Sequence, residues 1–301
     1  MSLECRLDIV CEECAVSQTI REAVEAFGRD VCAESAEDLS FPTSLDASRR
    51  VLRAVENPDI GMSDLSKIVV AEPLLSAKVI RLANSVALNP NNQPVLDVRH
   101  AVLRVGMDPI KALAMVLIMD QLRQSQRHSG CRSLCNQLWE RSVHVAALSY
   151  VLARKLAHHL NADEAMFAGI VHDLGRFYLL SHVPDYPVLL EDPVVLAQCI
   201  DDLADQATKM VLNHLNLPAS VIDSVLASRE YSGEMPPTSL ADIRFIAGAV
   251  SPSRDPFEEL DTRITPAAVD AAKFGLDQGM VSEVIAASGD EIYSIVVALE
   301  S

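Results

Sequence analysis

Segment after segment of this chain places apolar residues at the three- and four-residue spacing of a helix face, and no stretch alternates apolar and polar residues like a half-buried strand. Residues 17–31, for example, carry Ile20, Val24 and Phe27 at helical spacing. Half of the residues are hydrophobic but only 4% are aromatic, and the abundant Ala and Leu favour helices. The sequence therefore predicts an all-α protein, and it contains no repeat of fixed period.

Proline, glycine and asparagine divide these segments. Asn57-Pro58 ends one predicted helix, and Gly106 ends another. The predicted helices span residues 17–31, 44–56, 63–70, 74–84, 98–105, 108–122, 133–160, 163–172, 193–202, 203–215, 218–228, 239–250, 266–274 and 280–287, with a last one from residue 290.

Charge and composition exclude several classes of protein. A formal net charge of −17 disfavours binding to nucleic acid, because phosphate backbones attract cations. No apolar run is long enough to span a membrane, and the N-terminus does not resemble a signal peptide. Seven cysteines, an odd number, are typical of reduced thiols, so we expect a cytoplasmic protein. Cys11 and Cys14 form a C-x-x-C motif, but no second motif completes a zinc site.

Residues Gly169 to Arg176 contain the strongest chemical signal, because His172 and Asp173 are adjacent. An imidazole and a carboxylate side by side can both bind a divalent metal. Sequence motifs of serine hydrolases, P-loop proteins and dinucleotide-binding proteins are absent.

The chain resembles HDOD-domain proteins, bacterial relatives of the HD and HD-GYP phosphohydrolases. Arg81-Leu82-Ala83-Asn84-Ser85 matches a family signature without change. Further segments that match in order are Phe41–Thr43, Ile68–Leu75, Ala101–Gly106, Leu138–Ser142 and Gly169–Arg176. The resemblance implies an HD-like bundle of two packed helical halves with a C-terminal helical extension.

The resemblance also implies a domain organisation. We expect an HDOD domain at 41–235, with an N-terminal half at 41–130 and an HD-like half at 131–235. Residues 1–40 form a separate segment with one amphipathic helix, and residues 236–301 form the helical extension.

Three departures from the family pattern predict a degenerate metal site. Arg141 stands where relatives have the first histidine ligand, and a guanidinium has no lone pair to give a metal. Ala204 and Gln206 replace a later His and Glu, and Ser228-Arg229 replaces a closing pair of histidines. We therefore expect no catalytic residue, no cofactor and no bound metal; any metal would have to use His172, Asp173 and Asp205.

The remaining His–Asp pair then has a structural interpretation. Asp173 is expected to accept backbone N–H groups or to pair with Arg141 or Arg176, and His172 to pack half-buried. The sharper form of this hypothesis is an Arg141–Asp173 ion pair, which would put a permanent cation where relatives hold a metal.

The resemblance favours a non-catalytic signal-transduction domain that binds a protein partner or a nucleotide second messenger. Arg81, Asn84 and Ser85, followed by the polar loop 84–95, are the candidate binding surface. A homodimer formed through the C-terminal extension is a further expectation. The alternative is a metal-dependent phosphohydrolase or phosphodiesterase acting on a nucleotide or cyclic dinucleotide, with His172, Asp173 and one or two of Asp201, Asp202, Asp205 or His144 as ligands.

Overall fold

A computed structural model describes residues 18–33, 46–57, 59–124, 129–215, 217, 219–227, 231–232, 234–258, 260 and 278–300. Throughout these ranges the regular structure is helical and no strand occurs, which confirms the all-α prediction. The Phe41–Thr43 segment, the Ser228-Arg229 positions and the predicted helix 266–274 lie outside the described residues. Within the described ranges, none of the helices combines the length and apolar character needed to cross a membrane.

The helices follow one another with short connections. In chain order they are α1 (Gln18–Ala33), α2 (Asp46–Val55), α3 (Met62–Val70), α4 (Pro73–Ala83), α5 (Val98–Val105), α6 (Met107–Gln124), α7 (Ser129–Leu156), α8 (Ala162–Val171), α9 (Leu174–His182), the 3₁₀ turns η2 (Val183–Asp185) and η3 (Pro187–Glu191), α10 (Pro193–His214), α11 (Ala219–Leu226), α12 (Leu240–Val250), α14 (Gln278–Ala287) and α15 (Gly289–Glu300).

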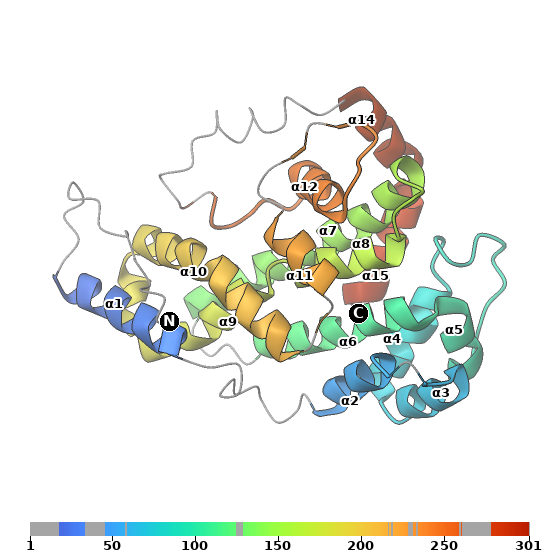
Figure 1. Cartoon of the computed structure of the whole chain (residues 1–301), viewed down its shortest axis with the longest axis horizontal. Coiled ribbons are helices and arrows are strands. Elements are labelled where there is room, and N and C mark those ends of the chain that lie inside the picture. Colours follow the sequence, from blue (N-terminus) through green and yellow to red (C-terminus); the bar gives the residue numbers. More distant parts are fainter. Residues whose placement is uncertain are drawn as a thin grey trace.

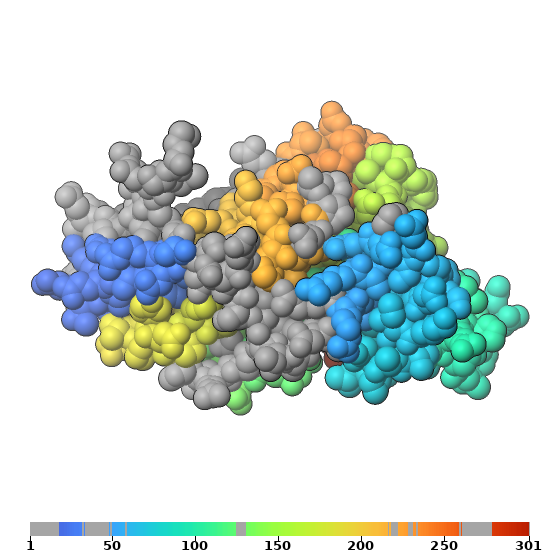
Figure 2. Space-filling view, turned by 60° about the horizontal axis from the view of Figure 1, so that its bottom comes forward, coloured from blue at the N-terminus to red at the C-terminus, as the bar shows by residue number. Residues whose placement is uncertain are grey.

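The helices form two groups joined by long central helices (Figure 1). One group contains α2 to α5, and the other contains α9 and α10 with α1 packed on η3 and α10. The central helix α6 contacts members of both groups, and α7 packs along α8. Figure 2 shows α1 and the α2–α5 group at opposite ends of one face.

Local sequence explains where several helices begin. The side chain of Asp97 accepts the backbone N–H of His100 at the start of α5, and Asn161 accepts those of the first turn of α8. Ser239 and Asp242 form a reciprocal capping box at the start of α12. Gly106 ends α5 with a φ of 85°, a conformation that disfavours side chains with a Cβ.

Two elements differ from the sequence-based prediction. α9 (Leu174–His182) was not among the predicted helices; only two residues separate it from the end of α8, so no proline or polar loop divides the two helices in the sequence. Residues 193–214 form one helix, α10, rather than two, since the polar Asp201 and Asp202 lie inside it without breaking it.

One large apolar core runs through both groups of helices, and a second cluster joins α7 and α8 to α12 and α14. Two glycines allow close helix packing next to the His–Asp pair. A Cβ on Gly169 would lie 2.6 Å from the Cα of Ala146 on α7, and one on Gly175 would lie 2.4 Å from the backbone nitrogen of Thr208 on α10. These contacts fix the positions of α8 and α9.

The C-terminal helix α15 packs against α4 of one group and against α7. The buried Lys78 of α4 donates a hydrogen bond to the backbone carbonyl of Leu299, at 2.7 Å. On the other side, Lys155 of α7 forms a 3.2 Å ion pair with Glu291. The helix α15 therefore contacts one group of helices and the central helix α7.

Candidate functional site

His172 ends α8 and its imidazole is oriented by the helix itself. The Nδ1 atom lies 2.7 Å from the backbone carbonyl of Gly169, and because a carbonyl oxygen only accepts, Nδ1 carries a proton and donates it to this hydrogen bond. Nε2 lies 3.0 Å from Oδ2 of Asp173. Neither of these two atoms has a hydrogen-bond partner of suitable geometry within the described part of the chain, although the two atoms lie close together.

Asp173 precedes α9 and is 3% exposed. Its other oxygen lies 3.2 Å from Nη1 of Arg176, one turn further along α9. The same Nη1 lies 2.6 Å from Oδ2 of Asp255, and Nη2 lies 2.5 Å from Oδ1 of Asp201. Three carboxylates from separate parts of the chain therefore bind one guanidinium.

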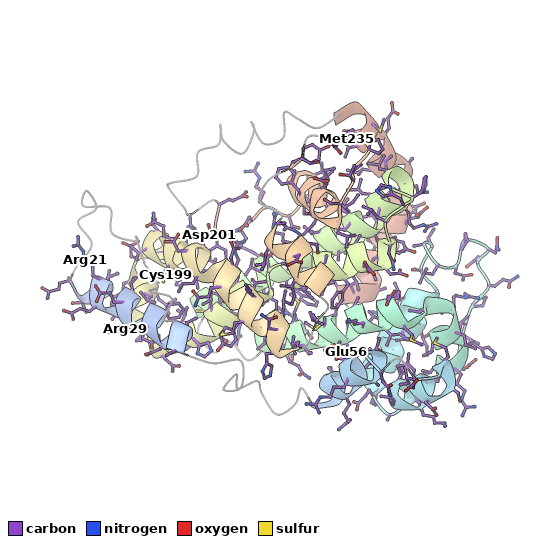
Figure 3. The ribbon with its side chains drawn as sticks, viewed as in Figure 1. Arg21, Arg29, Glu56, Cys199, Asp201 and Met235 are labelled. Carbon is purple, nitrogen blue, oxygen red and sulfur yellow. The ribbon has the colours of Figure 1, made fainter. Side chains whose placement is uncertain are left out.

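This Arg176 cluster, defined as Arg176 with Asp173, Asp201 and Asp255, brings together α9, α10 and the segment after α12. Figure 3 labels Asp201 on α10, close to that segment. The guanidinium also lies over the ring of Phe257, with its carbon 5.2 Å from the ring centre. Because the Arg176 side chain is only 16% exposed, this arrangement neutralises charge away from water.

The cluster strongly favours its charged forms. Burial alone would raise the pKa of Asp173, but His172, Arg176 and Arg141 outweigh burial and hold that pKa well below its usual value. Burial would likewise lower the pKa of Arg176, yet its three carboxylate partners raise it well above the usual value. Burial lowers the pKa of the neighbouring Arg244 to about 10, although Asp173 opposes this effect. The surroundings therefore favour the charged forms of both Asp173 and Arg176.

The predicted Arg141–Asp173 ion pair is wrong, because Arg141 forms a different contact. Its Nη1 donates to the backbone carbonyl of Ser253, 3.1 Å away, and it influences Asp173 only at longer range. Arg176, the alternative predicted partner, takes the position beside the carboxylate. His144 accompanies Arg141, since its Nδ1 lies 2.8 Å from the carbonyl of Glu140 and 3.2 Å from the hydroxyl of Ser253.

The donor set does not fit a catalytic divalent metal. His172 Nε2 and Asp173 Oδ2 are adjacent and without hydrogen-bond partners, but a catalytic zinc site takes three protein ligands. The structure does not bring Asp205 to this pair: no group of three His, Cys, Asp or Glu side chains arranged to hold a metal occurs among the described residues. Asp201 and Asp255 instead face a guanidinium, which repels a cation.

Asp255 is the site residue that sequence reasoning missed. It lies 79 positions after Arg176, in a proline-rich, charged stretch that looked like a connection between helices. Its other oxygen accepts the backbone N–H of Phe257, a local turn that directs the side chain inward. Only the Asp-Pro dipeptide could have indicated a turn here, and no spacing rule connects it to α9.

The candidate binding surface divides into structural and exposed residues. The Asn84 amide donates to the carbonyls of Ile80 and Val95 and accepts the N–H of Val95, so it closes the loop 84–95. Ser85 is 5% exposed and donates to the carbonyl of Leu82. Arg81 is exposed and forms no ion pair with any described residue.

Arg81 lines a groove between α4 and α15, which we call the α4–α15 groove, with a volume of about 740 Å³. Its side chains include Tyr293, which is 71% exposed, and Val86, which is 48% exposed. The full lining consists of Ala77, Ile80, Arg81, Asn84, Ser85, Val86, Asp290, Tyr293, Ser294 and Val297. The C-terminal helix thus supplies one wall of the predicted binding surface.

Comparison with protein families matches the HDOD domain over residues 41–231. The chain belongs to the HDOD family. An uncharacterised protein of Treponema pallidum (strain Nichols) is 24% identical over 228 residues, which are 70% of this chain and 42% of that protein. The chain therefore spans less than half of the length of this curated relative.

Solved structures confirm the HD-like fold of this HDOD protein. A candidate metal-dependent phosphohydrolase from Shewanella amazonensis SB2B has a TM-score of 0.72 at 21% identity, covering 94% of this chain and all of that one. A candidate signal transduction protein from Marinobacter aquaeolei VT8 has a TM-score of 0.57 at 20% identity, covering 94% and 65%. An HDOD protein of unknown function from Geobacter sulfurreducens also has a TM-score of 0.57, at 18% identity, covering 92% and 97%.

Proposed function

We propose that this HDOD protein is a non-catalytic, cytoplasmic regulator of bacterial signal transduction that acts by binding a protein partner. The observation that carries the proposal is the Arg176 guanidinium bound by Asp173, Asp201 and Asp255. Hydrolysis by an HD-type site requires a metal that activates water, and the carboxylates available for one are already neutralised by a side chain. A guanidinium cannot take over this chemistry, because it does not coordinate a water molecule and lower the pKa of that water as a metal ion does.

The second candidate is a phosphohydrolase or phosphodiesterase acting on a nucleotide or cyclic dinucleotide. It is favoured by the adjacent Nε2 of His172 and Oδ2 of Asp173, two donor atoms without hydrogen-bond partners in the described chain. It would need further ligands from Asp205 or from a rearranged Arg176 cluster.

Metal analysis of the purified protein separates the two candidates. We expect no stoichiometric manganese, iron or zinc, the same thermal unfolding midpoint with and without chelator, and no hydrolysis of cyclic dinucleotides above that of an Asp173→Ala variant. Because Asp173→Ala removes one of the three carboxylates that bind Arg176, His172→Gln is a second variant that keeps the whole Arg176 cluster. A stoichiometric metal that is lost in His172→Gln, together with metal-dependent hydrolysis, would overturn the proposal.

We assign partner binding to the α4–α15 groove. Exposed Tyr and Arg side chains are enriched among residues that dominate protein interfaces, and Tyr293 and Arg81 lie in one groove. A photo-crosslinking amino acid at position 293 is expected to trap a partner in cells, and one at the exposed position 209 is not. Equal cross-linking from both positions would remove the groove from the proposal.

A nucleotide second messenger that binds to the α4–α15 groove without being hydrolysed is the alternative to a protein partner. Calorimetric titration with cyclic dinucleotides tests it. Saturable heat that disappears in Arg81→Glu would make the groove a nucleotide site instead of a protein-binding site.

A further inference from the structure

A second groove lies between α2 and α3, and it differs in charge from the rest of the molecule. We call it the α2–α3 groove; its volume is about 620 Å³. Its lining consists of Arg50, Arg53, Ala54, Asn57, Ile60, Lys67, Ile68, Ala71 and Glu72. Three cations and one anion thus surround an apolar floor. α2 and α3 are on the face shown in Figure 2 (blue to cyan), and Glu56, labelled in Figure 3, follows the end of α2.

The charge of this region contrasts with that of the whole chain. Residues 46–105 contain eight Lys or Arg and six Asp or Glu, whereas the remaining residues contain 17 Lys or Arg and 36 Asp or Glu. The protein is therefore positive where the α2–α3 groove lies and strongly negative elsewhere. An acidic partner is repelled by most of the surface and attracted to this part of it.

The cations in the groove are held only by exposed contacts. Arg50 pairs with Glu72 at 2.7 Å and Lys67 pairs with Asp64 at 2.7 Å, and the two cationic side chains are 63% and 67% exposed. Surface ion pairs of this kind contribute about 0–1 kcal/mol, so carboxylates of a partner can replace them. Arg53 is exposed and forms no ion pair within the described ranges, although its charge acts on Glu56.

The floor and rim of the groove add apolar contacts. Ile60 and Ile68 line it. Val70 precedes the lining residue Ala71, Leu74 follows the lining residue Glu72 by two positions, and these two side chains are 53% and 68% exposed. A ligand that is only anionic, such as free phosphate, leaves this apolar surface uncovered. An amphipathic peptide with carboxylates beside leucine-like side chains covers both features.

We propose that the α2–α3 groove is a docking site for an acidic amphipathic segment of a partner protein, with Arg50, Arg53 and Lys67 binding its carboxylates. This inference adds a second binding surface to the proposed regulator, and it does not depend on the absence of catalysis or on the α4–α15 groove.

Fluorescence anisotropy of the full chain with a labelled peptide of Glu, Leu and Ala in helical register tests the proposal, with the Lys-for-Glu peptide as the opposite-charge probe. We expect saturable binding of the acidic peptide only, weakened by added salt and weakened at least about tenfold in Arg50→Glu/Arg53→Glu. Arg53→Glu/Lys67→Glu gives the same loss without disturbing the Arg50–Glu72 pair. The matched control Arg99→Glu/Lys209→Glu reverses two exposed charges outside the groove and is expected to change binding less than about twofold.

Four results would overturn the inference. The acidic peptide fails to bind, or binds equally well to both groove variants. A single-stranded oligonucleotide displaces the peptide at lower concentration than unlabelled peptide does, which makes the site a nucleic-acid site. The groove variants convert a dimer to a monomer in sedimentation, which makes the occupant a second copy of this chain. If the purified protein contains no metal and does not bind the peptide, the proposed function still stands and only this inference is wrong.

Discussion

At the scale of single residues, the Arg176 cluster predicts how divalent metal ions affect the stability of this protein and of its variants. Arg176→Ala leaves three carboxylates facing one another, and removing one partner from a buried ion pair costs about 3–5 kcal/mol. A divalent cation can then occupy the vacated position between the carboxylates. We expect Arg176→Ala to be destabilised in chelator and partly restored by manganese, measured by urea unfolding, while wild type responds to neither.

Arg99→Ala, on the exposed side of α5, is the matched control and is expected to behave like wild type. A variant at 176 that ignores manganese would mean that Asp173, Asp201 and Asp255 do not converge.

Asp163, in the first turn of α8, predicts a pH effect. Burial, and next the charge of Asp108, raise its pKa from 3.8 to about 6, although Arg154 opposes them. The folded state then holds a proton that the unfolded state releases, so stability falls as pH rises from about 4 to 6 and stays lower above that range. Asp163→Asn removes this loss. Its midpoint of thermal unfolding is expected to exceed that of wild type at pH 8 and to match it near pH 4, and a constant difference across this range would contradict the assignment.

At the scale of helices, close packing of α9 on α10 depends on Gly175. A Cβ there would lie 2.4 Å from the Thr208 nitrogen and 2.7 Å from the Ala204 carbonyl oxygen, both backbone atoms that cannot move away easily. Gly175→Ala is expected to cost at least about 1–3 kcal/mol by overpacking, measured by chemical denaturation. Gly289→Ala, where a Cβ meets nothing within 4 Å, is expected to be neutral or stabilising. Equal stability of the two variants would mean that α9 and α10 are further apart.

Most helices were predictable from the sequence, and contacts between distant parts of the chain were not. α5 was predicted with its exact ends, because Asp97 and Gly106 are recognisable caps. α9 was missed because only two residues separate it from the end of α8, and no proline or polar loop marks it as a separate helix. In the candidate site, the residues of the His–Asp motif were recognised from their local spacing, but Asp255 contacts Arg176 only through the folded chain. Tyr293 likewise lies in the α4–α15 groove only because the folded chain brings α15 next to α4.

At the scale of the whole molecule, α15 connects parts of the bundle that are far apart in sequence. Leu299 is fully buried and its carbonyl accepts the hydrogen bond from Lys78 of α4. Truncating a buried leucine removes packing and leaves a cavity, so Leu299→Ala is expected to cost about 2–5 kcal/mol in urea unfolding. Tyr293→Ala on the same helix removes a side chain that is 71% exposed and is expected to change stability by less than about 0.5 kcal/mol.

Both variants are expected to unfold in a single transition, because the large core is continuous between the two groups of helices. Two separate transitions in Leu299→Ala would instead identify the groups as independently folding units.

The cation at the centre of the Arg176 cluster is part of the polypeptide, so its presence does not depend on the concentration of any ion in solution. A bound ion dissociates, competes with other ions and becomes scarce when its supply falls. A guanidinium is made with the chain, in a fixed ratio of one per molecule, and is present from the moment of synthesis. The internal charge balance of this protein is therefore set by its gene and not by the mineral content of the medium in which its cell grows.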